Sequence, residues 1–381
     1  MKKLTVFIVF VFIVQFALGQ KVALVMNEDG KFGFITEQGE YLFEPVENKL
    51  KEFSNGLAPV QVDKKWGFID ANGKQVIAPQ FNRVKPFDSG LALVEKDKEW
   101  FYIDKKGNKV TMPESDKLYK FENGVALIKR AEKIGLINPE GDVILEPAYN
   151  KILAFYNGYA KVKKGEKWGV IKASGDIYIE PVYEYIGVVS EGVVQAKKNG
   201  VFGIVKNGEF IPVEGALNIW DFRDGEALTY ASNQDKLVGF INRNGEWVIT
   251  PSYKKVRAFV NGLAPVTTGG KVWGYINPQG EMVIKEQYRD AEIFSKDGLA
   301  PVKIKKTWGF IDKIGKLVIE DKYTISTFNP FKLFSKSNEK GFIDGLARVS
   351  YEKKWGFINA KGSLLKDTWF IHAEPFKEIG Q

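Results

Sequence analysis

An aromatic or aliphatic residue followed by glycine recurs along the chain at a nearly constant spacing. The first five intervals are equal, as from Trp66 to Trp100, the next three are slightly longer, and the last is the longest. A fixed period between about 20 and 50 residues is the signature of a repeat array. In one of the ten pairs phenylalanine stands in place of the glycine. The pairs are Phe32-Gly33, Trp66-Gly67, Trp100-Phe101, Ile134-Gly135, Trp168-Gly169, Phe202-Gly203, Val238-Gly239, Trp273-Gly274, Trp308-Gly309 and Trp355-Gly356.

The period is about 34 residues, which is also that of the tetratricopeptide helix pair, so the composition of each unit has to decide the secondary structure. Most units carry three glycines, as at Gly56, Gly67 and Gly73 in the second unit. Each glycine inside a helix costs about 1 kcal/mol relative to alanine. The units are also rich in Val, Ile, Phe, Tyr and Trp, which favour strands. The sequence therefore predicts an all-β repeat protein.

The second unit shows how one repeat is expected to fold. Residues 57–62, 65–69 and 74–77 each form a short β-type run, and the turn between the last two runs is Asp70-Ala71-Asn72-Gly73. An aspartate that opens a turn can bond its own backbone, and a glycine that closes it adopts positive φ without a Cβ clash. Each unit is therefore predicted to be a three-stranded antiparallel meander followed by a connector.

The apolar residues of each unit point to both faces of the expected meander, so both faces need cover. In the second unit Trp66 and Phe68 point to one face and Ile69 to the other. Connector aromatics such as Phe81 and Phe87 are expected to fill the space between neighbouring units. We expect an open, superhelical, solenoid-like array, because ten units exceed the usual four to eight blades of a propeller. The alternative is a closed, propeller-like ring.

Four strings carry a resemblance to a known family: KWGFIDANGKQVIAP from Lys65, KWGVIKASGDIYIEP from Lys167, VWGYINPQGEMVIKE from Val272 and TWGFIDKIGKLVIED from Thr307. They resemble the bacterial WG repeats, also called KWG repeats. The resemblance covers residues 20–365 as ten units, the tenth incomplete, and leaves residues 366–381 as a C-terminal cap or tail. It implies a β-rich repeat in secreted or envelope-associated proteins that mediates interactions, and it brings no catalytic residues.

Residues 1–19 have the features of a secretory signal peptide. Lys2 and Lys3 precede an apolar run over residues 4–14, and Ala17-Leu18-Gly19 places small residues at the positions that signal peptidase reads. No later stretch reaches about 18 apolar residues, the length that a spanning helix needs. We therefore expect an exported protein of the periplasm, the cell surface or the medium, whose mature chain does not span a membrane.

The residues available for chemistry exclude several classes of function. The chain has no cysteine and a single histidine, His372, so it has no thiol nucleophile and no metal site that needs two histidines. No phosphate-binding loop of the form GxxxxGK[ST] is present. Lysines alternate with acidic residues, which does not favour nucleic acid as a partner. We expect no catalytic residue, metal or cofactor.

The repeat residues are predicted to be structural, because the same side chain in the same place of every unit is how a repeat packs. These residues are Trp66, Gly67, Trp100, Trp168, Gly169, Trp273, Gly274, Trp308, Gly309, Trp355 and Gly356. Tryptophans outside this pattern, and the apolar side chains of the insertion before the tenth unit, are candidate interaction residues. They are Trp220, Trp247 and Trp369, with Phe328, Phe331 and Phe334.

Two functions follow from this pattern. The first is a non-enzymatic exported scaffold that binds a protein or an envelope polysaccharide. The second is a glycan-binding protein, or less favourably a glycoside hydrolase, built around the irregular repeats. Lysines near one hairpin tip of many units, such as Lys64, Lys164 and Lys353, would form a basic edge toward anionic polymers if the units stack with little rotation.

Overall fold

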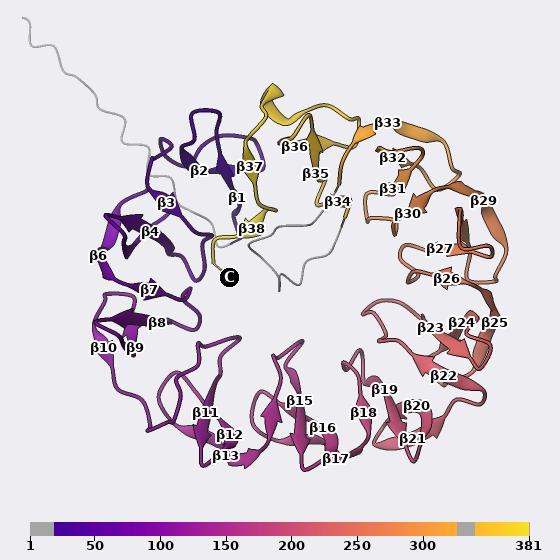
Figure 1. Ribbon diagram of the computed structural model, residues 1–381, viewed down its shortest axis with the longest axis horizontal. Helices are drawn as coiled ribbons and strands as arrows, with labels where there is room; N and C mark the ends of the chain where they lie inside the picture. The colour runs from indigo at the N-terminus through magenta and orange to yellow at the C-terminus, as the bar shows by residue number, and fades with distance from the viewer. Residues whose placement is uncertain (1–18, 326–339, 381) are drawn as a thin grey trace, which may run out of the picture.

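The protein is a closed ring of ten small antiparallel sheets in a computed structural model that describes residues 19–325 and 340–380 (Figure 1). The sheets follow one another around the ring in chain order, and we number them 1 to 10. The predicted signal peptide up to residue 18 and the candidates Phe328, Phe331 and Phe334 lie outside the described residues.

Sheet 2 is typical of the ring. Its strands are β3 (Lys49–Leu50), β4 (Ala58–Val62), β5 (Lys65–Ile69) and β6 (Gln75–Phe81), hydrogen-bonded in that order. The three longer strands match the predicted meander. The short fourth strand comes from the connector, which the sequence predicts to be a link only. Seven of the ten sheets described have a fourth strand from the connector, and sheet 1 reaches four strands with two from the C-terminal segment, so the prediction of three strands per unit is too low.

The first half of the ring continues on both sides of sheet 2. Sheet 1 contains β1 (Lys21–Met26), β2 (Phe32–Thr36), β37 (His372–Ala373) and β38 (Lys377–Glu378). Sheet 3 contains β7 (Arg83–Val84), β8 (Leu91–Lys96), β9 (Glu99–Asp104) and β10 (Lys109–Val110). Sheet 4 contains β11 (Ala126–Arg130), β12 (Lys133–Ile137) and β13 (Val143–Tyr149). Sheet 5 contains β14 (Lys151–Ile152), β15 (Tyr159–Lys164), β16 (Lys167–Lys172) and β17 (Ile177–Tyr183).

The second half completes the circle. Sheet 6 contains β18 (Tyr185–Ile186), β19 (Val193–Lys198), β20 (Val201–Lys206) and β21 (Glu209–Pro212). Sheet 7 contains β22 (Ala216–Ile219), β23 (Leu228–Asn233), β24 (Val238–Asn242) and β25 (Trp247–Tyr253). Sheet 8 contains β26 (Lys255–Val256), β27 (Ala264–Thr267), β28 (Trp273–Ile276) and β29 (Met282–Tyr288). Sheet 9 contains β30 (Asp290–Ala291), β31 (Ala300–Lys303), β32 (Trp308–Ile311) and β33 (Leu317–Tyr323). Sheet 10 contains β34 (Phe342–Ile343), β35 (Leu346–Tyr351) and β36 (Lys354–Asn359), and the short 3₁₀ helix η1 (Leu365–Asp367) follows it.

The glycine of the Trp-Gly pair is required by a bulge in the strand beside it. Phe68 pairs with Ile77 and Trp66 with Phe81, so the segment 78–80 faces the single residue Gly67. A Cβ at Gly67 would clash with the Ile77 carbonyl oxygen and lie 2.7 Å from the Pro79 nitrogen. A Cβ would also clash with a backbone carbonyl oxygen of the neighbouring strand at Gly135, Gly169, Gly239, Gly274 and Gly309. Where Phe101 replaces this glycine in sheet 3, the third strand β10 is cut down to Lys109–Val110.

Two kinds of tight turn complete each unit. Asn55 and Gly56 both have positive φ (54° and 88°), and Ser54 and Leu57 exchange backbone hydrogen bonds across them, which describes a hairpin turn of type I′. Such inner turns, as between β7 and β8 or between β26 and β27, point toward the middle of the ring (Figure 1). The second kind is the predicted Asx turn, in which Asp70 Oδ1 accepts the backbone N–H groups of Asn72 and Lys74.

Each hydrophobic core lies between two neighbouring sheets. One core joins Trp66, Phe68 and Phe81 of sheet 2 to Val94 and Ile103 of sheet 3, and the connector residue Phe87 lies between the sheets. The rings of Phe68 and Phe87 meet edge to face, with centroids 4.8 Å apart. Burial of each such side chain contributes about 2–3 kcal/mol. Neighbouring units therefore depend on one another for their cores, as expected.

The chain closes the ring with its own C-terminal segment. Strand β1 pairs with β2 on one edge and with β37 and β38 on the other. The last core also crosses this seam, because Val25 of sheet 1 packs with Phe357, Phe370 and Ala373. Ion pairs bridge the seam as well, among them Lys21–Asp344, Lys354–Glu28, Lys366–Glu40 and Lys377–Glu52.

The expectation of an open superhelical array is therefore wrong, and the closed ring that was its alternative is confirmed. An open array would leave the free edge of β1 unpaired and the Val25 side of sheet 1 exposed to water. The prediction was wrong because it relied on the usual number of blades in a propeller. Ten units close a ring when each sheet is rotated by about one-tenth of a turn relative to the one before it. Turns rather than whole strands approach the middle of the ring, as Figure 1 shows, so the ten units do not crowd there.

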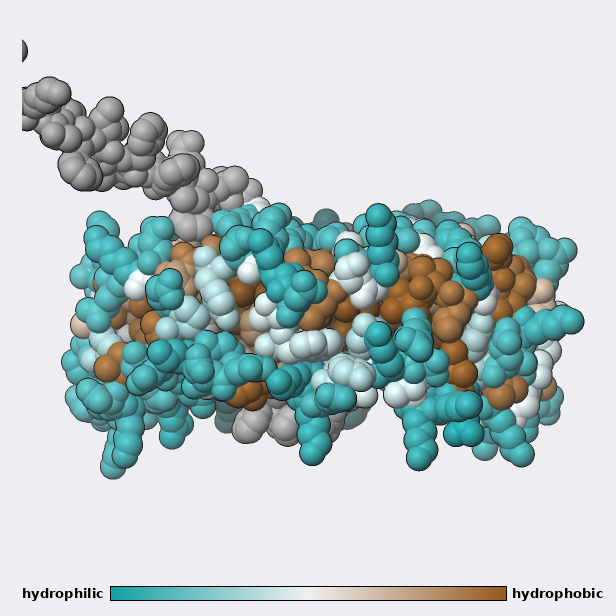
Figure 2. Space-filling view, turned by 90° about the horizontal axis from the view of Figure 1, so that it is seen from above, coloured by the Kyte–Doolittle hydropathy of each residue, from teal (hydrophilic) through white to brown (hydrophobic). Residues whose placement is uncertain are grey.

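Seen from the edge, the ring is a flat slab (Figure 2). Apolar side chains show along the middle of this rim, with polar side chains above and below. The third strands contribute exposed residues of this kind, namely Val76, Val248, Val283 and Val318. Among residues 19–325 and 340–380, no helix has the length and apolar character needed to cross a membrane.

Candidate binding site between the seventh and eighth sheets

Three of the six repeat tryptophans are buried in the fold and leave little surface for a ligand. Trp66, Trp273 and Trp308 are each only 8% exposed. In sheets 2 and 8 a cation also covers the ring, since Lys51 Nζ lies 4.1 Å from the Trp66 centroid and Arg257 Cζ lies 5.2 Å from that of Trp273. These cations occupy equivalent places, because Lys51 and Arg257 donate their backbone N–H groups to Pro59 and Pro265 respectively.

Sheet 7 differs from this pattern, because its tryptophan is not at the anchor position but earlier in the unit. Val238 occupies the anchor position, and Trp220 donates its backbone N–H to Tyr230, which places it where Lys51 lies in sheet 2. The ring of Trp220 stacks on that of Tyr230, with centroids 4.9 Å apart and planes at 30°. The smaller valine leaves open the space that a tryptophan fills elsewhere in the ring.

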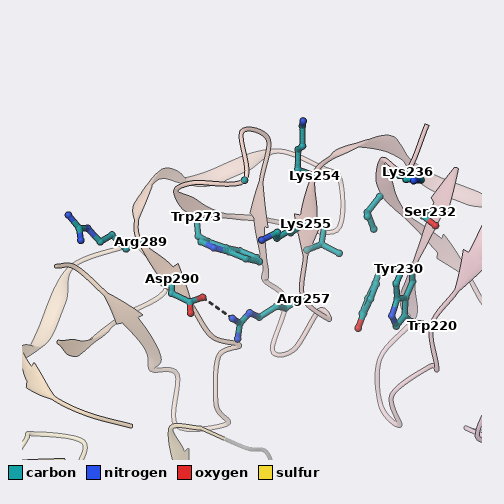
Figure 3. Close-up of a pocket in the computed structure, with 13 residues that line it drawn as sticks. Trp220, Tyr230, Ser232, Lys236, Lys254, Lys255, Arg257, Trp273, Arg289 and Asp290 are labelled. Carbon is teal, nitrogen blue, oxygen red and sulfur yellow. Dashed lines mark hydrogen bonds and ion pairs between the residues drawn. The ribbon is translucent and has the colours of Figure 1, made fainter. Parts of the chain in front are cut away.

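A groove of about 710 Å³ occupies this space, and we call it the Trp220 groove. Trp220 and Tyr230 lie on one side of it, and Trp273 and Arg257 lie on the other, as Figure 3 shows. Its lining comes from three consecutive sheets and their connectors: Trp220, Tyr230, Ser232, Lys236, Val238, Lys254, Lys255, Val256, Arg257, Gly270, Trp273, Arg289 and Asp290.

The electrostatic character of the groove is strongly basic. Its single carboxylate, Asp290, is paired with Arg257 at 2.8 Å. Arg257 also contacts Glu292, so its charge is already neutralised. Four cations remain, which make no ion pair with any residue of 19–325 or 340–380: Lys236, Lys254, Lys255 and Arg289. All four are exposed. Lys255 points toward Trp273 in Figure 3, whereas Lys254 and Arg289 point away from the aromatic rings.

The aromatic wall is held rigidly from behind. The Thr229 hydroxyl donates to the backbone carbonyls of Trp220 and Asp221, which fixes the segment that carries Trp220. Tyr230 meets the fully buried Phe240 edge to face, with centroids 6.4 Å apart. Burial raises the pKa of the Tyr230 phenol above its ordinary value of 10.0.

The two other tryptophan candidates, Trp247 and Trp369, do not line this groove. Trp247 donates its ring N–H to the Glu214 carbonyl oxygen at 3.0 Å, and Trp369 packs between Gly356 and Tyr351. Both rings therefore contact their own chain. The lysine-rich tips form tight turns, as at Asp63-Lys64, and several of their lysines are paired, for example Lys163 with Glu166.

No cluster of metal-ligating side chains occurs in the described part of the chain. His372 lies in the seam strand β37, where its Nε2 is 3.1 Å from Glu374 Oε1. The sequence alone identifies no acidic partner for this histidine. The structure supplies one from the same segment, and the pair belongs to the closure of the ring.

Sequence reasoning selected Trp220 but missed Tyr230, Lys255, Arg257 and Arg289. A signal was present, because the loss of tryptophan at Val238 coincides with the extra tryptophan Trp220 shortly before it. The basic run Lys254-Lys255 follows in the next connector. The three features lie in different parts of the repeat pattern, so only the packing of sheets 7, 8 and 9 brings them together.

Comparison with known proteins identifies the repeat. A family model described as "WG containing repeat" matches residues 32–66, 66–100, 100–133, 134–168, 168–202, 239–271, 273–308 and 308–324. No curated protein matches the chain.

Solved structures offer only distant similarity. A eukaryotic initiation factor is 9% identical, with a TM-score of 0.45, and the match covers 95% of this chain and 98% of that one. BamB from Moraxella catarrhalis is 12% identical, with a TM-score of 0.30, over 68% of this chain and 88% of its own. The computationally designed Ika8 protein is also 12% identical, with a TM-score of 0.34, over 69% and 95%. Similarities at this level carry no argument about function.

Proposed function

The chain belongs to the family of WG containing repeats, and from this premise we propose that it is an exported, non-enzymatic scaffold that holds a protein or polysaccharide partner of the cell envelope. The observation that carries the proposal is the Trp220 groove, a concave surface that is both basic and aromatic. Elsewhere many polar side chains are used by the fold itself, as in the Asx turns and the seam.

A rigid frame supports this role. Inner turns of neighbouring units are hydrogen-bonded to one another, for example Gly90 N–H to Asn55 Oδ1 and Gly124 N–H to Ser89 Oγ, both at 2.9 Å. Arg243 ties sheets 6 and 7 by donating to the Ser190 carbonyl oxygen at 2.7 Å. A surface held in its binding conformation loses less entropy when a partner binds.

Glycan binding is the second candidate, and the stacked pair of Trp220 and Tyr230 favours it. Hydrolysis is less favoured, because glycoside hydrolases generally use two carboxylates that flank the bond. The groove offers only Asp290, and that carboxylate is engaged by Arg257.

Cell fractionation combined with a pull-down tests the proposed function. The full chain carrying a C-terminal tag is expected outside the cytoplasm, and a variant without residues 1–19 is expected inside it, because the leader directs export. The purified ring is expected to retain one defined protein or polysaccharide from an envelope extract. A full chain that stays in the cytoplasm, or a ring that retains nothing specifically, would contradict the proposal.

A further inference from the structure

We infer that the Trp220 groove binds an acidic polysaccharide, with one sugar ring on the Trp220–Tyr230 pair and its carboxylate or sulfate group on Lys255. The inference deepens the proposed scaffold function and rests on it. Three features of the groove indicate this class of ligand: its shape, its aromatic wall and its unpaired cations.

The origin of the groove supports a binding role rather than a packing defect. Loss of the anchor tryptophan at Val238 would ordinarily leave a cavity for neighbouring side chains to fill. Instead the side chains around it are kept apart by fixed contacts: Trp220 by Tyr230 and Thr229, and Arg257 by Asp290 and Trp273. The resulting volume of about 710 Å³ lies within the range of about 300–1,000 Å³ typical of ligand sites.

The aromatic wall is suited to a single flat, partly apolar ring. The apolar C–H face of a sugar can stack on an aromatic ring, which presents a large flat apolar surface. A single-stranded nucleic acid stacks successive bases on successive aromatic side chains. Here Trp220 and Tyr230 stack on each other, so the pair offers the groove one outer ring face rather than two separate ones. Trp273 is 8% exposed and already contacts Arg257. The groove therefore favours a sugar.

The charge of the groove requires an anionic ligand. Lys255 lies on the Trp273 side of the groove and faces the Trp220–Tyr230 pair across it, and Lys236, Lys254 and Arg289 add positive potential at the groove. A polymer with a negative group on each sugar would place one group at Lys255 and further groups near the cations at the edges of the groove. A neutral glycan would gain the stacking contact but none of these charge-assisted hydrogen bonds.

Titration calorimetry with defined oligosaccharides tests the inference on the full ring. The probes are a hexamer of galacturonic acid, the neutral hexamer of glucose, and a short oligothymidylate as the nucleic-acid competitor. The acidic hexamer is expected to bind at least about tenfold more tightly than either of the others. Raising the salt from about 20 mM to about 300 mM is expected to weaken binding of the acidic hexamer about tenfold. Equal affinity for both sugars, no binding at all, or tighter binding of the oligothymidylate would overturn the inference.

Substitutions locate the site. Trp220→Ala and Lys255→Ala are each expected to weaken binding of the acidic hexamer about fivefold to tenfold. Lys285→Ala is the matched control, because Lys285 is an exposed, unpaired lysine of β29, within the described residues, that does not line the groove. Equal loss in the control and in Lys255→Ala would contradict the inference.

A double variant separates binding from folding. Val238→Trp with Trp220→Lys restores the tryptophan and covering lysine of sheet 2, so the ring is expected to stay folded while the groove is filled. Binding of the acidic hexamer should then be lost without a fall in melting temperature. Binding that survives would place the ligand elsewhere. If an envelope partner is still retained by a ring carrying Trp220→Ala, the scaffold function stands and only the groove assignment fails.

Discussion

Gly67 shows how a single residue position controls the shape of a sheet. The bulge of β6 passes so close to it that no side chain fits between the two strands. The repeated glycine could be recognised in the sequence, but its reason could not, because the close approach arises between residues 67 and 77–79.

Gly67→Ala is expected to destabilise the ring by about 2–3 kcal/mol, because the added methyl group meets backbone atoms that cannot move aside. Gly269→Ala is the control, since a Cβ there has no neighbour within 4 Å. Urea unfolding followed by tryptophan fluorescence measures both. Equal stability of the two variants would show that the bulge relaxes at little cost.

Tyr102 makes the stability of the ring sensitive to alkali. Its hydroxyl donates to the Tyr119 carbonyl oxygen, and burial raises the pKa of the phenol from its ordinary value of 10.0 to about 12. Between these two values the unfolded chain loses the phenolic proton and the folded chain keeps it, so stability falls as pH rises through this window.

Wild-type stability is therefore expected to drop by about 1–3 kcal/mol between pH 10 and pH 12 through this residue. The variant Tyr102→Phe has no phenolic proton to lose. Its free energy of unfolding should therefore fall less between pH 10 and pH 12, although the variant is less stable than the wild type at neutral pH. Urea unfolding at several pH values checks this. A variant with the same alkaline loss as the wild type would assign the effect to other groups.

Among structural elements, the Asx turn carries two roles at once. Its aspartate or asparagine closes the second hairpin of a unit, as Asp312 does by accepting the N–H groups of Ile314 and Lys316. Its glycine lies against the preceding sheet, as Gly315 does against Ile284. The first role was predictable from local sequence, whereas the second depends on the neighbouring unit.

Asp312→Ala is expected to cost about 1 kcal/mol, because two backbone N–H groups lose their acceptor. Asp312→Asn keeps a side-chain oxygen in the same place, and Asn277 already serves this turn in sheet 8. The asparagine variant should therefore melt close to the wild type. Thermal unfolding by circular dichroism compares the three proteins, and an unchanged alanine variant would contradict the role given to the turn.

For the whole molecule, closure of the ring predicts a contact between the two ends of the chain that can be tested directly. Val25 and Ala373 lie near opposite ends of the chain, yet they face each other across β1 and β37, and both are fully buried. The backbone bonds from Glu374 to Leu24 and from Ile371 to Met26 flank this pair. The two residues form a pair that is not itself hydrogen-bonded, where antiparallel strands bring Cα atoms to about 4.5 Å.

The double variant Val25→Cys/Ala373→Cys is therefore expected to form a disulfide on oxidation, in a chain that has no other cysteine. A thiol assay and gel mobility without reductant detect it. Under oxidising conditions the crosslink should increase the free energy of unfolding by up to about 4 kcal/mol. The melting temperature should rise accordingly. Free thiols in the folded, oxidised protein would argue for an open array. A pair within sheet 5 that is likewise not hydrogen-bonded, Lys161→Cys/Val170→Cys, controls for the reactivity of paired thiols.

The sequence by itself determined the β-type unit, its turns and its tandem repetition, because each of these depends on residues close together in the chain. The Asx turns, the inner Asn-Gly hairpins and the alternation around Trp66 are all local patterns. Ring closure was decided only in the tertiary structure, since a small rotation at each of ten interfaces adds up to a full circle. The Trp220 groove was decided there too, because Val238 leaves the space, and residues of sheets 7, 8 and 9 must meet around it.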